Sequence, residues 1–299
     1  MIVKTIYDRY FVKQLKKYKP PLRYVGGKSR DSKYNIRHFP NNIKEYREPF
    51  LGGGSVALEF TKQNPNLPVW VNDKYYYLYN FWLQLQKESI SLTEDILTLK
   101  QKHNTQDKAR DLFNRCQENI SKVDNIKQAV YFYIINKCSF SGLGQNSSFS
   151  AGASDLNFSQ QGIYKLPTYS KIIQNWNITN LDYSELLNDS TKSFVFLDPP
   201  YDIKSFIYGG KGGTMHRNFT HDTFAQDCYK SNKKWLITYN SNDTIKKLFE
   251  KYNMKEWDMT YTMRSTGSYT EEQSKRKELL ITNYKIKLYN EQLSLFNEN

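Results

Sequence analysis

The 299-residue chain has little of what would mark a secreted, membrane-bound or metal-dependent protein. Its three cysteines, Cys116, Cys138 and Cys228, have no paired spacing, which is typical of a reducing interior rather than a disulfide framework. No run of about 18 apolar residues occurs, and the charged N-terminal stretch lacks an apolar signal segment, so we expect a soluble cytoplasmic protein. The four histidines form no ligand pattern with the cysteines, so we expect no metal site.

Positive charge, in contrast, is abundant and clustered. Lys and Arg outnumber Asp and Glu by 43 to 30, which gives a net charge of +13. Residues 1–37 contain eleven basic and two acidic side chains, and residues 203–217 add Lys204, Lys211 and Arg217 without an acid. A solvated basic face is the alternative interpretation. An excess of this size in two clusters favours nucleic acid, whose phosphates must be neutralised on binding.

The order of apolar segments predicts an α/β fold with an insertion. Strands alternate with helical segments in both halves, which favours a mostly parallel sheet. From about residue 89 to residue 175 the pattern changes to polar helices and a nearly uncharged segment. We therefore expect residues 1–88 and 176–299 to form one α/β domain around an inserted, mainly helical domain. The expected strands are residues 44–50, 68–72, 176–178, 194–197, 234–239 and 277–284.

The tetrapeptide Asp198-Pro199-Pro200-Tyr201 directly follows the apolar run at residues 194–197. It therefore lies at the carboxyl end of a strand, where ligands bind in open α/β sheets. The prolines remove two backbone donors and fix φ twice, so their carbonyls remain available as acceptors on a stiff chain. A carboxylate, a carbonyl and an aromatic face together suit an amino group on a planar ring. An ordinary turn is the alternative.

A glycine turn is the second chemical feature. Residues 48–55 (E-P-F-L-G-G-G-S) join an expected strand to a helix, and glycine there permits positive φ and close approach of a ligand. The turn has neither the dinucleotide fingerprint nor the Lys-Ser/Thr of a P-loop. Asn72-Asp73 ends the next strand, and an acid about 20 residues after such a turn is placed to bind ribose hydroxyls. Together the two pieces favour a nucleoside-containing cofactor, although aspartate also caps helices.

Six segments, in order, resemble the Dam-like (D12 class, alpha-group) DNA N6-adenine methyltransferases over nearly the whole chain. Tyr24 stands where that family usually has Trp in the first block, and Lys137 and Ser141 replace Arg and Asn in the fourth. These departures concern the target sequence rather than the reaction. The blocks are residues 21–28 (family L-R-W-x-G-G-K), 48–55 (E-P-F-x-G-G-G-S), 72–73 (N-D), 133–143 (N-R-x-x-F-N-G-L), 198–201 (D-P-P-Y) and 277–284 (E-L-L-I-T-N-Y).

The resemblance implies a Rossmann-like sheet that binds S-adenosylmethionine, with a target-recognition domain inserted at residues 89–175. It implies methyl transfer to N6 of an adenine flipped out of double-stranded DNA, with S-adenosylhomocysteine as the product and no metal. Asp198 and the Pro199 carbonyl would accept hydrogen bonds from N6, Pro200 would stiffen the motif, and Tyr201 would stack on the base. A cognate restriction endonuclease in the same system is a further expected partner.

Other roles follow from the resemblance and from position. Lys28 could bind the cofactor or a DNA phosphate, and the two roles are equally expected. Asp182 could contact the adenine of the cofactor or, equally, serve as a helix N-cap. For Asn136, Phe140 and Ser141, contact with DNA or bracing of it and a buried helix end with a polar turn are equal alternatives. Residues 139–163 are nearly uncharged, with seven serines and four glycines, and within them residues 139–149 suit base reading or groove filling. A surface loop without such a role is the alternative. Expected cofactor residues are Tyr24, Gly26, Lys28, Phe50, Gly52, Gly54, Ser55, Asp73, Asp182 and Asp198. Expected DNA-binding residues are Lys28, Asn136, Lys137, Phe140, Ser141, Gln145, Asn146 and Arg217.

Two other functions remain open from the sequence. Related tetrapeptides also serve RNA and protein methyltransferases, although Asp at position 198, the glycine-turn spacing and the N-terminal block favour DNA. A catalytically silent DNA-binding protein would need neither an intact tetrapeptide nor an intact glycine turn. A site-specific DNA adenine methyltransferase is therefore the preferred interpretation.

Overall fold

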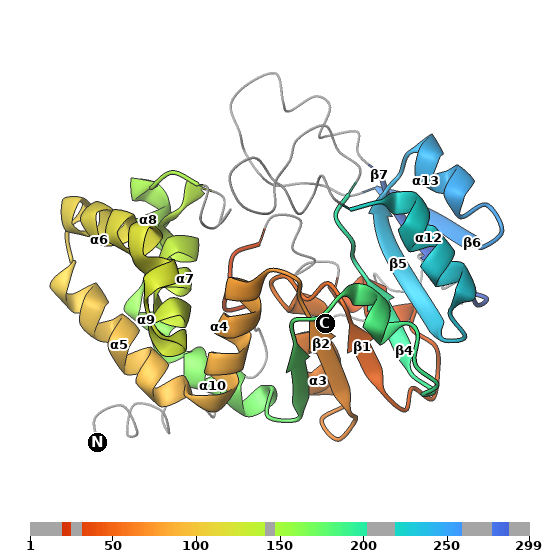
Figure 1. The fold of residues 1–299 in the computed structure, drawn as a ribbon, viewed down its shortest axis with the longest axis horizontal. Coiled ribbons are helices and arrows are strands. Elements are labelled where there is room, and N and C mark those ends of the chain that lie inside the picture. The colour runs from red at the N-terminus through yellow and green to blue at the C-terminus, as the bar shows by residue number, and fades with distance from the viewer. Residues whose placement is uncertain (1–19, 25–31, 141–146, 202–218, 259–276, 287–299) are drawn as a thin grey trace, which may run out of the picture.

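The computed structural model describes residues 20–24, 32–140, 147–201, 219–258 and 277–286, and its centre is a seven-stranded sheet (Figure 1). The strand order is β3-β2-β1-β4-β5-β7-β6, in which β1 to β5 are parallel and β7 runs antiparallel to both β5 and β6. The prediction of a mostly parallel α/β sheet is confirmed. The strands are β1 (Tyr46–Glu48), β2 (Val69–Asn72), β3 (Trp176–Thr179), β4 (Phe194–Leu197), β5 (Lys234–Asn240), β6 (Asn253–Asp258) and β7 (Lys277–Thr282).

Strand β4 shows why the sheet is buried on both faces. Successive side chains of a strand point to opposite faces. Phe194 and Phe196 accordingly join one hydrophobic cluster, whereas Val195 and Leu197 join a second one. A continuous apolar run is what a central parallel strand requires, since helices cover both of its faces.

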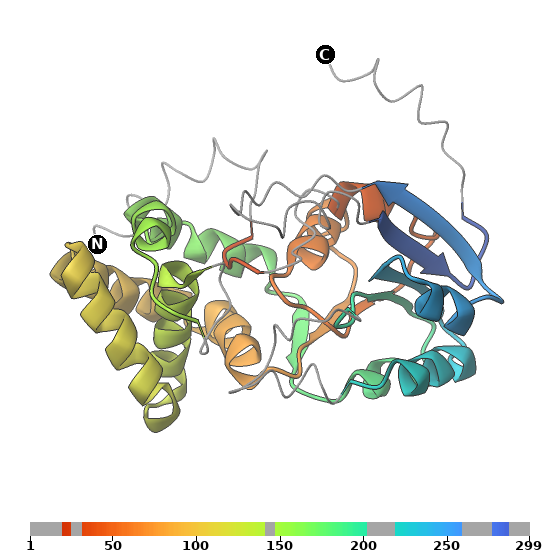
Figure 2. The same ribbon diagram turned by 90° about the horizontal axis from the view of Figure 1, so that it is seen from above.

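The helices lie on both sides of this sheet (Figure 2). Side chains of α3 pack in the first cluster, and those of α12 and α13 pack in the second. Within the described ranges, no helix is long and apolar enough to cross a membrane. The helices flanking the sheet are α2 (Ser32–Arg37), α3 (Ser55–Gln63), α4 (Tyr76–Lys87), α12 (His221–Lys230) and α13 (Asp243–Leu248), with the 3-10 turn η4 (Tyr183–Leu186).

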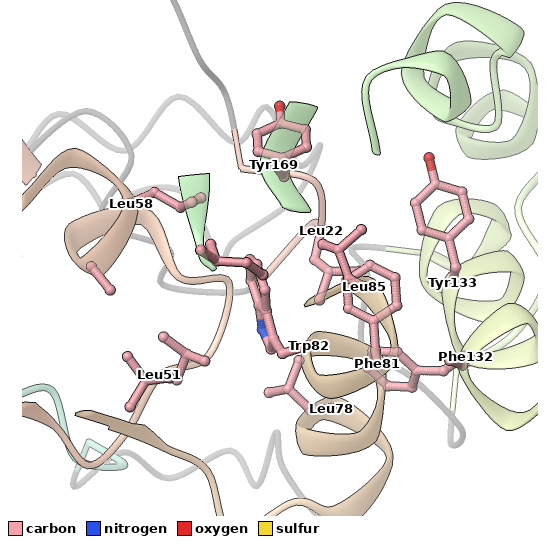
Figure 3. Packing of buried hydrophobic residues seen from close by; sticks show 14 of the residues in the cluster. Leu22, Leu51, Leu58, Leu78, Phe81, Trp82, Leu85, Phe132, Tyr133 and Tyr169 are labelled. Atoms are coloured by element: carbon pink, nitrogen blue, oxygen red, sulfur yellow. The ribbon is translucent and has the colours of Figure 1, made fainter. Parts of the chain in front are cut away.

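A helical region between α4 and β3 occupies the place of the expected insertion. Its core is continuous with that of the sheet, because Phe81 of α4 stacks on Tyr133 of α7 with ring centroids 5.9 Å apart (Figure 3). The helical region therefore packs on the α/β part through a shared hydrophobic core. The domain boundaries at residues 89 and 175 remain a prediction. Its elements are α5 (Ser89–Lys102), α6 (Gln106–Asn119), η1 (Ile120–Lys122), α7 (Asn125–Cys138), α8 (Ala151–Asn157), α9 (Gln160–Tyr164) and α10 (Leu166–Ile172).

A buried arginine ties β1 to the segments before β4 and β5. The side chain of Arg47 is 1% exposed; its Nε donates to Glu45 at 2.5 Å and its Nη2 to Asp189 at 2.6 Å. A third donor, Nη1, reaches the Leu186 carbonyl at 3.0 Å, and Lys233 also pairs with Asp189. Breaking an ion pair of a buried side chain is costly because the remaining charge loses its partner, and the cost is reduced here because the side chains of Glu45 and Asp189 are 25% and 34% exposed.

Replacing Arg47 with Leu should therefore lower the free energy of unfolding by about 3 kcal/mol, the low end for a broken buried pair, since Lys233 still neutralises Asp189. Urea denaturation measures this loss. Lys127→Ala is the control, because Lys127 and Asp124 are both 60% exposed and such pairs contribute about 0–1 kcal/mol. Equal effects of the two substitutions would contradict the structural role of Arg47.

Candidate active site

The glycine turn and the tetrapeptide lie side by side at the carboxyl edge of the sheet. They follow β1 and β4, which are neighbours in the sheet, at the point where the strand order reverses. Such a switch point is where open α/β sheets bind ligands. Three acids meet there: burial raises the pKa of Glu48 well above its ordinary value, and the nearby charges of Asp198 and Asp73 raise it further, against the hydrogen bond from Tyr46.

The glycine turn is packed between two aromatic rings. Gly52 and Gly54 have positive φ values of 51° and 69°, as the sequence predicts for a turn from a strand into a helix. A Cβ on Gly52 would lie 2.9 Å from the Tyr24 ring, and one on Gly54 would lie 2.7 Å from the Trp82 ring. Trp82 also donates from Nε1 to the Gly52 carbonyl at 3.1 Å. Figure 3 shows its indole directed from α4 toward the chain at Leu51. Glycine is therefore required by packing as well as by the backbone.

Asp73 joins this turn to the end of β2. Its Oδ2 accepts the Gly52 backbone N–H at 2.9 Å and its Oδ1 accepts the Tyr75 N–H at 2.9 Å. The residue is 8% exposed, and burial raises its pKa to about 6 in spite of those two hydrogen bonds. A carboxylate has about four lone-pair sites, so acceptor capacity is left for hydroxyl donors. The ribose role of Asp73 remains a prediction that this geometry suits.

Asn72, next to Asp73, holds three strand ends in register. Its Nδ2 donates to the carbonyls of Pro49 and Leu181 at 3.2 Å each. Its Oδ1 accepts the Leu181 N–H at 2.7 Å and the Thr179 hydroxyl at 2.9 Å. The Asn-Asp pair thus places the Asp73 carboxylate relative to the segments that follow β1 and β3.

The carboxylate of the tetrapeptide, for which a catalytic role is predicted, is oriented from β5. Asp198 is half-buried and its Oδ1 accepts the hydroxyl of Thr238 at 2.7 Å, while Pro199 is buried and Pro200 half-buried. Thr238 lies one residue before Tyr239, whose ring centroid is 5.9 Å from that of Tyr201. The two residues at the end of β5 therefore contact both chemically distinctive side chains of the motif.

Aromatic rings surround Phe50 after β1. Phe50 stacks on Tyr183 at 5.5 Å and meets Phe219 at 5.8 Å and Phe224 at 5.9 Å. Only Tyr183 stacks on Phe50, whereas Phe219 and Phe224 meet it edge-on and Phe224 is buried. The half-buried rings of Phe50, Tyr183 and Phe219 offer an apolar surface beside the glycine turn, of the kind a purine or a thioether chain would contact. Of these rings only Phe50 was expected from the sequence, and its cofactor role remains a prediction.

Asp182 and Ser55 occupy helix starts. Asp182 is the N-cap of η4, where its Oδ1 accepts the Ser184 N–H at 3.2 Å and the Ser184 hydroxyl at 2.9 Å. Its side chain is 52% exposed and lies 3.8 Å from Lys74. Asp182 therefore has the N-cap role that was one of its two expected roles. Its contact with the cofactor remains a prediction. Ser55 is the first residue of α3 and is half-buried.

The end of α7 is buried against the N-terminal block. Asn136 accepts the Arg23 backbone N–H at 2.9 Å and donates to the Arg23 carbonyl at 2.7 Å, while the Arg23 guanidinium donates to the Ser139 carbonyl at 2.8 Å. Burial lowers the pKa of Lys137 to about 8, and its ammonium lies 5.3 Å from the Tyr133 ring centroid. Asn136 and Lys137 therefore lie below the surface and brace the region, so direct DNA contact by either remains a prediction.

Phe140, in contrast, is 62% exposed at the start of the nearly uncharged segment. Its N–H donates to the Ser148 carbonyl at 3.0 Å, and Ser139 bridges Phe149 in an antiparallel pair. The two ends of the segment are thus held together beside an exposed ring. Six of the expected site residues lie outside the described residues: Gly26, Lys28, Ser141, Gln145, Asn146 and Arg217.

Several residues of the site were not predicted. Glu48 and Glu278 lie inside blocks that were recognised, so their acidic character was an available signal. The sequence contains no such signal for Trp82 and Thr238. A tryptophan in an aromatic-rich helix and a threonine in a strand are ordinary packing residues. Within the described residues, no group of three His, Cys, Asp or Glu side chains could hold a metal.

The sheet order, with one antiparallel strand inserted next to its edge, and the glycine turn at the switch point define the class of Rossmann-like methyltransferases. Residues 24–263 match the D12 class N6 adenine-specific DNA methyltransferase family, and the chain belongs to that family. The family and the sequence resemblance thus agree.

Known relatives agree with this assignment. The chain is 27% identical to the type II methyltransferase M.MjaIII of Methanocaldococcus jannaschii, over 89% of this chain and 99% of the relative. It is 23% identical to the type II methyltransferase M1.LlaDCHI of Lactococcus lactis subsp. cremoris, over 89% of this chain and 95% of the relative. It is also 25% identical to a DNA N-6-adenine-methyltransferase of Escherichia phage P1, over 76% of this chain and 30% of that protein.

If Asp73 accepts ribose hydroxyls, affinity for S-adenosylhomocysteine should fall as the pH falls through about 6, because protonation turns an acceptor oxygen into a donor. Asp73→Asn should bind roughly ten-fold more weakly near neutral pH and lose this pH dependence. Titration calorimetry between about pH 5 and pH 8 covers the transition. Parallel pH profiles of the two proteins would exclude the ribose role.

The stability of the unliganded protein should show the opposite trend. The folded-state pKa of about 6 lies above the ordinary value, so Asp73 contributes stability below about pH 4 that is lost as the pH rises through 6. The stability difference between wild type and Asp73→Asn, measured by urea denaturation across this range, isolates that contribution.

Proposed function

We propose that this protein transfers a methyl group from S-adenosylmethionine to N6 of an adenine in a short duplex DNA sequence. The observation that carries the proposal is that the glycine turn with Asp73 and the tetrapeptide with Asp198 lie side by side at the switch point of the sheet. A cofactor held by the first would present its methyl group to a base held by the second.

The residues present fit S-adenosylmethionine. Asp73 retains acceptor capacity for ribose hydroxyls, Phe50 and its neighbouring rings offer an apolar surface, and Tyr24 covers the glycine turn. When bound, the cofactor supplies an electrophilic methyl group on a sulfonium sulfur. Gly52, Gly54 and Ser55 would lie along it, and Gly26 and Lys28 belong to the same N-terminal block.

Asp198 and the Pro199 carbonyl would activate the amine. The N6 lone pair of adenine is delocalised into the ring, and two acceptors on its hydrogens draw the nitrogen toward tetrahedral geometry. Positive charge would grow on N6 as its bond to the methyl carbon forms and the sulfur–carbon bond breaks with its electron pair on sulfur, and one N6 proton must then leave. Preorganised acceptors therefore stabilise the transition state more than the ground state. The Thr238 hydroxyl fixes one oxygen of the Asp198 carboxylate, which preorganises the acceptor.

The DNA must release the target base before this geometry can form. Flipping an adenine out of a duplex costs a few kcal/mol, and stacking on an aromatic ring such as Tyr201 offsets part of it. The chain has 43 basic and 30 acidic side chains, and this excess of positive charge supports contact with DNA phosphates. Arg217 and Lys28 are among the candidate phosphate ligands. The type II names of the relatives favour a restriction endonuclease as companion.

Residues 89–175 would select the target sequence. The exposed Phe140 and the polar segment that follows it, which includes Ser141, Gln145 and Asn146, carry groups that read base edges or fill a groove, whereas cations contact phosphates. Asn136 and Lys137 would brace this segment from below, given their burial.

Replacing Asp198 with Ala should reduce methyl transfer by on the order of 10²-fold or more, because a transition-state acceptor is lost. Affinity for S-adenosylhomocysteine should change little, since the glycine turn and Asp73 are untouched. Transfer of radioactive methyl groups to long unmethylated duplex DNA, RNA and protein measures the rate and identifies the substrate class. Asp243→Asn removes an exposed carboxylate as a control. Near-normal turnover by Asp198→Ala would refute its catalytic role.

Grafting residues 139–149 from a relative with a different target should transfer that target, if this segment reads bases. Substituting Gln145 or Asn146 should relax discrimination among sequences while leaving the salt dependence of DNA binding unchanged, because neither is a cation. Sequencing of modified bases in treated genomic DNA identifies the methylated sites. An active graft that keeps its original target would exclude the segment as the determinant.

A further inference from the structure

The tyrosine that ends the tetrapeptide is bound by an acid from a distant strand. The Tyr201 hydroxyl donates a 2.8 Å hydrogen bond to Oε2 of Glu278, 77 residues along the chain. Glu278 is the second residue of β7 and is only 1% exposed. Water therefore competes little for this contact, and a hydrogen bond to a charged acceptor is among the stronger ones in proteins.

The backbone around Glu278 is held on both sides, which makes its carboxylate a rigid anchor. Glu278 lies opposite Asn240 on β5 and opposite Trp257 on β6, so its strand is paired along both edges. Tyr201, in contrast, belongs to the segment after β4 and lies in no helix or strand. Its ring also contacts Tyr239, whose hydroxyl is 2.8 Å from Nδ1 of His221.

Stacking on a base needs an aromatic face but no hydroxyl. The hydroxyl of Tyr201 is instead used at the edge of the ring, where a bond to a fixed point restricts the tilt and position of the ring. A ring that is already ordered loses less conformational entropy when a base stacks on it. The hydrogen bond thus gives a physical reason for Tyr rather than Phe at position 201.

We propose that Glu278 is a positioning residue for the reaction, which acts by fixing the Tyr201 ring as the platform for the flipped adenine. This inference rests on the proposed function and adds β7 to the active site. Since β4 and β5 separate β7 from β1 and its glycine turn in the sheet, the contribution of Glu278 should fall on the DNA-dependent step and not on cofactor binding.

The test is a double-mutant cycle in single-turnover methyl transfer to long unmethylated duplex DNA, with saturating S-adenosylmethionine. Tyr201→Phe and Glu278→Leu should each reduce the rate by roughly ten-fold, the scale for one hydrogen bond to a charged group. The double variant should be no more than about two-fold slower than either single variant, because both remove the same contact. Glu278→Gln keeps an acceptor oxygen and should remain within about three-fold of wild type.

Affinity for S-adenosylhomocysteine should be unchanged in all four variants. A general structural defect, in contrast, would also weaken binding of S-adenosylhomocysteine. Glu256→Gln, which removes a partly exposed carboxylate from neighbouring β6, is the matched control and should keep the wild-type rate. The proposal is overturned if the two single losses multiply to roughly 100-fold in the double variant, or if Tyr201→Phe retains the wild-type rate.

If Glu278→Leu does not fold, Tyr201→Phe and Glu278→Gln still decide the matter. A roughly ten-fold loss in the first with little loss in the second supports the proposal, and equal rates overturn it. The proposed function fails separately, because in that case the wild-type protein itself would transfer no methyl group to DNA.

Discussion

The glycine-turn half of the candidate site depends on one buried carboxylate. Asp73 directly follows β2 and binds two backbone donors, Gly52 in the turn after β1 and Tyr75 at the N-cap of α4. Trp82 of α4 donates a hydrogen bond to the Gly52 carbonyl, so both the N–H and the carbonyl of Gly52 are bound. The cost of this arrangement is visible in the raised pKa of Asp73, since burial outweighs the two hydrogen bonds. A ligand whose hydroxyls donate hydrogen bonds to the Asp73 carboxylate would stabilise its ionised form and offset that cost. Ionisable groups with shifted pKa values are therefore often found in binding sites.

Glu48 allows two further acids to be close together. Asp198, Asp73 and Glu48 come from the ends of three adjacent strands, and three ionised carboxylates so close would repel one another. Burial and the other two charges raise the pKa of Glu48 well above its ordinary value, so it holds a proton readily. Its hydrogen bond from Tyr46 keeps it satisfied within the core. A protonated Glu48 adds no negative charge beside Asp198 and Asp73, the two acids proposed to bind the amine and the ribose.

The sequence predicted the elements well where local pattern decides them. The run at residues 194–197 and the Gly52–Gly54 turn are a strand and a positive-φ turn in the structure, as expected. Strand β6 was missed because its sequence, N-M-K-E-W-D, shows no apolar alternation, and its pairing with β7 decides its conformation. The contacts of Thr238 and Glu278 could not be predicted, since they join residues 40 and 77 positions apart through the sheet. The burial of Asn136 is likewise a tertiary effect, which depends on Arg23 more than 100 residues earlier.

The N-terminal block explains how the two halves of the protein meet. Arg23 binds the end of α7 through both its backbone groups and its guanidinium, and Tyr24, the next residue, packs on Gly52 and Gly53. Adjacent residues therefore contact the helical region and the glycine turn. Because Asn136 is buried and uses its amide for Arg23, the Ser139–Phe149 bridge begins from a fixed helix end. The exposed Phe140 thus extends from a frame whose position is set by the same segment that covers the glycine turn.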